Sequence, residues 1–211
     1  MNLYKYKDIN HYYKCQKSAN KRKHNLVWAS PQELDLVAEF IKTNISSIRF
    51  GICHGVRTGW EVEYLRKKLL CNVIGTEIGE TYKTKKFIIN WDFHKVKDEW
   101  IGATDFIYSN SIDHSYDPGF CLSQWISCLS ENGYCFIEWA PAYGADSYGN
   151  DVDPFRADFD EYKKIINDTY CLDSVIKAKG CRRKAKLGQK KSKDSKTETR
   201  YIFVIHRKPI K

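Results

Sequence analysis

The chain has 211 residues, 42% hydrophobic and 14% aromatic, which suffices to bury one core and predicts a single globular unit with net charge +9. No run of about 18 apolar residues occurs, which argues against a membrane-spanning protein. The amino terminus is polar and lacks the apolar stretch of a signal peptide, so we expect a cytoplasmic protein. The eight cysteines include no CxxC pair, which favours buried free thiols over disulfides, and we expect no bound metal.

Positive charge is concentrated in two segments. Residues 177–200 hold eleven basic and two acidic residues, and the first 25 residues hold seven basic and one acidic. The rest of the chain is net negative, which predicts a basic rim on an acidic body. Such a rim suits an anionic substrate, RNA or DNA included, and the candidate contacts are Lys21, Arg22, Arg182 and Arg183. The alternative is a solvated loop that binds nothing.

Residues 1–29 form a basic, aromatic N-terminal extension ahead of a domain that we expect over residues 30–211. Tyrosines interleave there with lysines and arginines, a composition that suits the stacking of bases and the binding of phosphates. A helix packed across the fold suits this composition equally well. Ser30 and Glu33 then form a capping box around Pro31, which predicts a helix to about Thr43.

The stretch from Ser47 to Glu77 carries the main functional signal. Residues 47–51 are predicted to end a buried strand, and Thr58 to cap the helix that follows a glycine turn. A second strand over residues 72–76 leads into Glu77. Strand, glycine turn, helix, strand and acid form the βαβ nucleotide-binding unit, in which the acid accepts ribose hydroxyls. A plain turn without a ligand is the alternative.

Two further strands end in polar residues. A third strand, residues 87–90, precedes Asp92 and Phe93, which suit an adenine pocket but also suit an ordinary turn beside core aromatics. A fourth strand, residues 104–109, precedes Asp113 and His114. Both could act as acid or base at the carboxyl edge of the sheet, although a histidine there is more often structural.

The remaining elements complete an alternating pattern. A helix begins at Asp117 and Pro118, and a fifth strand is expected over residues 134–139. The long loop 140–156, with Tyr143 as a candidate substrate contact, suits a lid. A capping box at Asp158 starts the next helix. Two strands, residues 172–178 and 201–207, then form an antiparallel hairpin around the basic loop 177–200.

These elements together resemble the class I S-adenosylmethionine-dependent methyltransferases over about residues 45–207. The resemblance implies an α/β fold: a three-layer αβα sandwich with a seven-stranded, mostly parallel sheet and a C-terminal antiparallel hairpin. It also implies methyl transfer with S-adenosyl-L-methionine as cofactor. The implied cofactor-binding residues are Gly51, Cys53, His54, Gly55, Gly59, Glu77, Asp92, Phe93, Ser109 and Asn110. The chain departs from the family in its sparser glycine motif, which follows Arg49 and Phe50 instead of an acid.

Methyl transfer from a sulfonium depends on alignment more than on covalent catalysis, and Asp113 or His114 could remove the acceptor's proton. One alternative is a non-catalytic nucleic-acid-binding module with a vestigial nucleoside pocket. Another is a nicotinamide-dependent oxidoreductase, which fits Glu77 but neither the glycine spacing nor the terminal hairpin. The sequence identifies no methyl acceptor and no oligomeric state.

Overall fold

The computed structural model describes residues 1–141, 149–181, 185–186 and 197–207. Its central sheet has seven strands in the order β5-β4-β3-β6-β7-β11-β9, and β11 pairs antiparallel with both β7 and β9. The other neighbouring pairs are parallel, which confirms the predicted mostly parallel sheet with a C-terminal antiparallel hairpin. The strands are β3 (Phe50–His54), β4 (Asn72–Glu77), β5 (Ile88–Asn90), β6 (Thr104–Ser109), β7 (Leu129–Trp139), β9 (Cys171–Cys181) and β11 (Thr197–His206).

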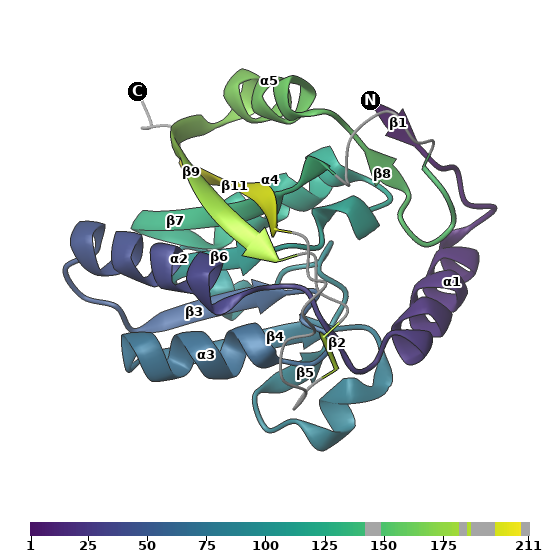
Figure 1. Cartoon of the computed structure of the whole chain (residues 1–211), viewed down its shortest axis with the longest axis horizontal. Helices are drawn as coiled ribbons and strands as arrows, with labels where there is room; N and C mark the ends of the chain where they lie inside the picture. The colour runs from purple at the N-terminus through teal and green to yellow at the C-terminus, as the bar shows by residue number, and fades with distance from the viewer. Residues whose placement is uncertain (142–148, 182–184, 187–196, 208–211) are drawn as a thin grey trace.

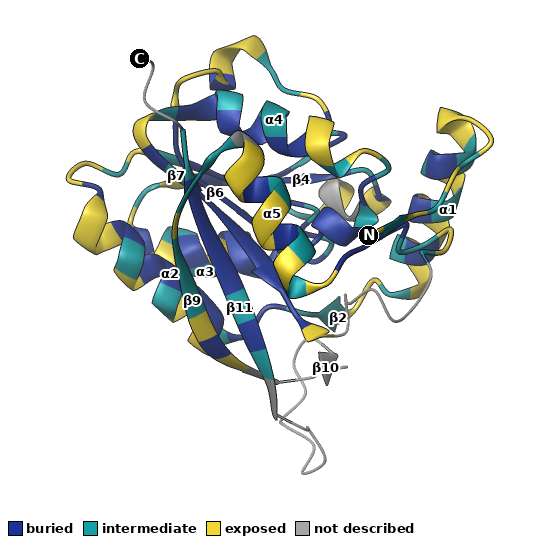
Figure 2. Ribbon diagram, turned by 90° about the horizontal axis from the view of Figure 1, so that it is seen from above, coloured by how far each residue is buried: buried dark blue, intermediate teal, exposed yellow. Residues whose placement is uncertain are grey.

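Helices cover both faces of the sheet, which confirms the three-layer sandwich (Figure 1). Successive residues of β3 show the alternation, because Ile52 joins the core under α4 and α5, whereas Cys53 joins the core under α2 and α3. Figure 2 shows the strands buried between these layers. The helices are α2 (Pro31–Asn44), α3 (Trp60–Leu69), α4 (Pro118–Cys128) and α5 (Phe159–Thr169), with short 3₁₀ turns η1 (Glu80–Thr84), η2 (Asp98–Trp100) and η3 (Ile112–His114).

Local signals in the sequence set most helix starts. Capping boxes begin α2 at Ser30 and α5 at Asp158, and the Asp117 side chain accepts from the backbone N–H of Phe120 at the start of α4. The fifth strand begins earlier than predicted. Leu129 already pairs with Thr104, so β7 follows α4 without an intervening turn.

The N-terminal residues form a helix, α1 (Ile9–Arg22), that lies across the end of the fold toward which β3 and β4 point (Figure 1). Its Tyr12, Gln16 and Ala19 are buried at helical spacing. Two short pairings flank α1: β1 (Asn2–Leu3) with β8 (Phe155–Arg156), and β2 (Leu26–Val27) with β10 (Ala185–Lys186). Of the two interpretations of this segment, the structure favours the helix packed across the fold.

A buried ionic network fixes the segment between α1 and the sheet. Arg200 on β11 donates to Glu138 on β7 at 2.8 Å and to Glu33 Oε2 on α2 at 3.2 Å. It also donates to the carbonyl of Trp28 at 3.0 Å, so the chain leading out of α1 is tied to the sheet. Burial, together with the nearby Glu33, raises the pKa of Glu138 to about 8, which the Arg200 charge opposes.

None of the helices described is long and apolar enough to cross a membrane. Free thiols were predicted in place of disulfides, and the cysteines found free are Cys15, Cys53, Cys71, Cys121, Cys128, Cys135 and Cys171.

Candidate functional site

A pocket with a cavity volume of about 40 Å³ lies at the carboxyl edge of the sheet, between the strand ends and α1. Parallel α/β sheets bind ligands at this edge because the loops there leave a crevice. The strand ends contribute Gly55, Arg57, Glu77, Ile78, Phe93, Ser111 and His114, and the α1 side contributes Tyr12, Gln16, Ala19, Asn20 and Lys23. The predicted turn, ribose-binding acid and candidate base therefore meet in one cavity.

The glycine turn begins later than predicted, because β3 continues to His54. Gly51 lies inside the strand, where an added Cβ would come within 2.2 Å of the Phe106 ring. The Cys53 side chain is fully buried in the core. His54 stacks on Trp125 with ring centroids 4.7 Å apart, and burial lowers its pKa to about 3, so the imidazole is neutral. The prediction that the turn includes Gly51, Cys53 and His54 was wrong, because all three lie in β3; their contacts to a cofactor stay predictions.

The turn itself rests on three residues with positive φ: Gly55 at 69°, Arg57 at 41° and Gly59 at 73°. Gly59 occupies the N-cap of α3, so Thr58 is not the predicted cap, although its Oγ1 accepts from the N–H of Trp60 at 3.3 Å. A positive φ disfavours arginine, and Arg57 holds it while lining the pocket. Sequence reasoning missed Arg57 because only glycines were taken as signals of this backbone geometry.

Glu77 is fixed in place by the turn. Its Oε2 accepts from the N–H of Arg57 at 2.7 Å and its Oε1 from the N–H of Gly79 at 2.8 Å. The carboxylate is buried but lines the pocket. The predicted acid thus lies at the end of β4, beside the turn, as the βαβ pattern requires.

Glu61, in the first turn of α3, is a buried carboxyl group that sequence reasoning missed. Its Oε1 accepts from Asn110 Nδ2 at 3.4 Å, whereas its Oε2 has no hydrogen-bond partner among the described residues. Burial raises its pKa to about 7. Asn110 Oδ1 in turn lies 3.0 Å from Ser111 Oγ, which lies 3.1 Å from the carbonyl of Gly55. These contacts connect Glu61 and the predicted residue Asn110 to the turn.

Asp92 lies next to the main pocket instead of in its lining. Its Oδ2 accepts from the hydroxyl of Tyr13 on α1 at 2.7 Å, and its Oδ1 bonds the His94 ring at 2.7 Å. Burial would raise the pKa of Asp92, but the bonds from His94 and Tyr13 hold it below its ordinary value. Asp92 lines an adjoining pocket of about 290 Å³ together with Tyr13, and Ile78 borders both pockets.

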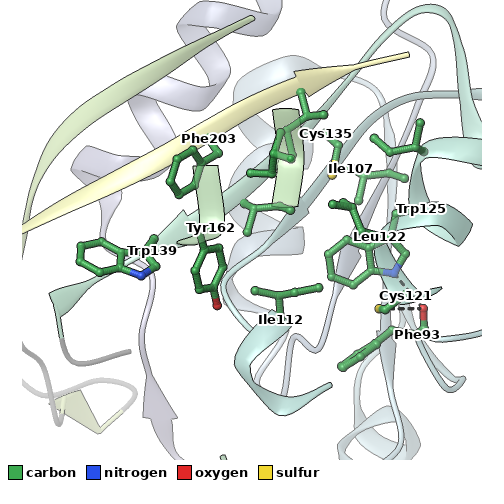
Figure 3. Packing of buried hydrophobic residues seen from close by; sticks show 14 of the residues in the cluster. Phe93, Ile107, Ile112, Cys121, Leu122, Trp125, Cys135, Trp139, Tyr162 and Phe203 are labelled. Carbon is green, nitrogen blue, oxygen red and sulfur yellow. Dashed lines mark hydrogen bonds between the residues drawn. The ribbon is translucent and has the colours of Figure 1, made fainter. Parts of the chain in front are cut away.

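Phe93 borders the main pocket and is anchored from behind. Its backbone carbonyl accepts from Trp125 Nε1 at 2.8 Å, and Cys121 Sγ lies 3.8 Å from the same oxygen (Figure 3). The ring packs into the core formed with α4. This anchoring places an aromatic wall beside Ile78, as the predicted adenine pocket requires.

Asp113 and His114 occupy η3, directly after β6. His114 lines the pocket, and its Nδ1 lies 2.8 Å from the carbonyl of Val152 and 3.4 Å from Asp153 Oδ1. Asp113 is 5% exposed, and burial raises its pKa. The structure brings His114 to the cavity, with the buried Asp113 beside it, and adds Asp153, which no sequence pattern connects to them.

The sequence matches no protein-family model and no curated protein. Among solved structures, it superimposes on 1,6-didemethyltoxoflavin-N1-methyltransferase of Burkholderia thailandensis, solved with 1,6-didemethyltoxoflavin and S-adenosylhomocysteine. The TM-score is 0.69 at 11% identity, over 97% of this chain and 92% of that one. The chain has the class I methyltransferase fold. Two further structures share this fold. A methyltransferase from Aquifex aeolicus has a TM-score of 0.56 at 13% identity, over 90% of this chain and 98% of that one. Geranyl diphosphate C-methyltransferase from Streptomyces coelicolor has a TM-score of 0.56 at 12% identity, over 82% of this chain and 79% of that one.

On this class I methyltransferase fold, the remaining predicted residues fall into three groups. Ser109 is buried, with its Oγ 3.1 Å from the carbonyl of His54, so it secures the strand ends. Lys21 and Arg22 are exposed and line no described pocket, whereas their neighbour Lys23 lines the main one. Tyr143, Arg182 and Arg183 lie outside the described residues, so their substrate contacts stay predictions.

Proposed function

We propose that the protein is an S-adenosylmethionine-dependent methyltransferase. The observation that carries this proposal is the cavity in which Glu77, the positive-φ turn and His114 meet on a class I methyltransferase fold. The fold alone does not determine the ligand, because the compared structures share at most 13% identity with this chain.

The residues at the pocket fit the cofactor. Glu77 offers a fixed carboxylate for the ribose hydroxyls, and Ile78 and Phe93 offer apolar walls for adenine. A Cβ at Gly55 would come within 2.6 Å of Ser111, so the turn allows only backbone at this point. Buried Arg57 Nε has no hydrogen-bond partner among the described residues, and it could bind the carboxylate of the methionine end. When bound, S-adenosyl-L-methionine would supply an electrophilic methyl group.

We place the methyl acceptor beside His114 and Asp113. Residues of α1 form one wall of this pocket, which would help to hold an acceptor in line for transfer. His114 is oriented by Val152 and can accept a proton from an oxygen or nitrogen nucleophile.

We further propose an anionic acceptor, RNA or DNA included. Pairing of β2 with β10 brings residues 185–186 of the basic loop beside the chain that follows α1. The two basic segments thus adjoin at one side of the pocket, and Lys23 reaches its lining. This arrangement equally favours the second candidate, a nucleic-acid-binding module, which differs in lacking cofactor binding.

Calorimetric titration with S-adenosyl-L-homocysteine tests the main proposal. Replacing Glu77 with Gln removes a charged acceptor, so affinity should fall by about 10- to 100-fold. Glu80→Gln is the matched control, because Glu80 is exposed nearby on η1, and it should bind as the parent does. Equal affinities of the parent and Glu77→Gln would refute the placement of the pocket.

Fluorescence anisotropy with labelled RNA and DNA tests the acceptor class. Phosphate contacts release counterions, so affinity should fall steeply between about 50 and 200 mM salt. Deletion of residues 182–196 should abolish this binding and leave cofactor affinity intact. Nucleic-acid binding without any cofactor binding would favour the binding module, and no nucleic-acid binding would leave a small anionic acceptor.

A further inference from the structure

Three metal-ligand side chains meet beside the pocket. Asp113 and His114 come from η3, after β6, and Asp153 comes from the segment that leads into β8. A ligand atom of each lies within 4.8 Å of those of the other two, a grouping that the sequence pattern did not predict. Two carboxylates and one imidazole are a donor set that binds divalent cations.

An unpartnered buried oxygen points to a cation at this place. Asp113 is 5% exposed, and its Oδ1 has no hydrogen-bond partner among the described residues. A buried carboxylate oxygen without a donor is costly. The carboxylate of Asp153 lies within 4.8 Å and adds repulsion to this cost. A bound cation would satisfy the free oxygen and remove the repulsion between the carboxylates.

Neighbouring groups orient the three side chains. His114 Nδ1 lies 2.8 Å from the carbonyl of Val152 and 3.4 Å from Asp153 Oδ1, so a cation bound through Nδ1 would replace the hydrogen bond to Val152. Asp153 Oδ2 accepts from Arg156 at 3.0 Å, so the second oxygen, Oδ1, faces His114. The Asn150 side chain accepts from the N–H groups of Val152 and Asp153, each at 2.9 Å, and so fixes this segment.

We propose that Asp113, His114 and Asp153 bind a divalent cation of the Mn²⁺ type. Mixed carboxylate and imidazole donors suit Mn²⁺, whereas Mg²⁺ and Ca²⁺ take oxygen donors. Lys23 Nζ lies 3.9 Å from Asp153 Oδ1 and competes with the cation, so affinity is moderate. If the proposed methyl transfer holds, the cation would activate an acceptor hydroxyl. His114 would then be a metal ligand and not the base.

Mn²⁺ binding to the chelator-treated full chain tests the site, without any methyl donor. Loss of the electron paramagnetic resonance signal of free Mn²⁺ should show one bound ion per chain. Asp153→Asn and Asp113→Asn should each weaken binding at least tenfold, and Asp151→Asn, an exposed neighbour in the same segment, should not. Lys23→Met should tighten binding several-fold because it removes the competing ammonium.

Binding with the same affinity in the parent and Asp153→Asn, or no binding at all, would overturn the site. If Asp113→Asn fails to fold, Asp153→Asn and Lys23→Met test the site alone. Weaker Mn²⁺ binding in the first and tighter binding in the second would not be expected of a cluster with a purely structural role. S-Adenosylhomocysteine titrated in the presence of chelator separates the two proposals. Cofactor binding without Mn²⁺ binding refutes the cation site alone, and the reverse result refutes the methyltransferase.

Discussion

The pKa of Glu61 predicts a distinctive dependence of stability on pH. Its side chain is 5% exposed, its Oε2 lacks a partner among the described residues, and burial raises its pKa from 4.5 to about 7. The folded state therefore holds a proton on Glu61 that the unfolded state releases above its ordinary pKa. Its contribution to stability is complete below pH 4.5 and is lost as the pH rises through 7.

The magnitude follows from the shift. A shift of this size corresponds to about 3 kcal/mol of unfolding free energy, at roughly 1.4 kcal/mol per pKa unit. Glu61→Gln stays neutral at every pH, so it should match the parent near pH 4.5 and exceed it by about 3 kcal/mol at pH 8.5. Urea unfolding at a series of pH values measures the difference.

A matched control lies on the same helix. Glu63 is exposed, so Glu63→Gln should follow the parent's pH profile to within a few tenths of a kcal/mol. Parallel profiles for the parent and Glu61→Gln would show that Glu61 ionises normally in the fold, which would refute the reasoning from its burial.

Two further substitutions test residues that the structure places differently from expectation. Gly51→Ala should cost about 1–3 kcal/mol in urea unfolding because its Cβ would meet the Phe106 ring; full stability would show that the strand has room there. Tyr13→Phe releases Asp92 from its 2.7 Å bond, so S-adenosylhomocysteine should bind about 3- to 10-fold tighter by calorimetry, and weaker binding would make Tyr13 a ligand contact.

The elements predicted correctly rest on local physics. Ser30 and Glu33, with a proline between them, determine the start of α2 through contacts within one turn. Glu77 was located because a short apolar run ending in an acid indicates a strand that delivers a side chain to the sheet edge. The hairpin likewise followed from two β-rich runs without a helical pattern between them.

The predictions that were wrong or missing concern features determined by contacts between residues far apart in the sequence. The end of β3 is set by pairing of His54 with Thr76 and Ser109, which moves the turn past Gly51. Asp153 reaches His114 through the folding of its segment against η3, beside the β1–β8 pair. The spacing of residues along the chain predicts neither the end of β3 nor the approach of Asp153 to His114.

Three of the buried polar atoms that lack a hydrogen-bond partner among the described residues lie near the proposed ligand site. Arg57 Nε, Glu61 Oε2 and Asp113 Oδ1 are buried and unbonded among the described residues, and all three residues follow the carboxyl ends of β3 and β6. Elsewhere in the interior, charged groups such as Arg200 and Glu138 are paired. Other unpartnered atoms, such as Trp60 Nε1 and Ser174 Oγ, lie outside this group, so only the three near the carboxyl ends of β3 and β6 bear on the ligand. A molecule bound at that edge would satisfy them. That inference depends on the burial of these atoms and holds whichever anion or nucleophile the basic side of the pocket receives.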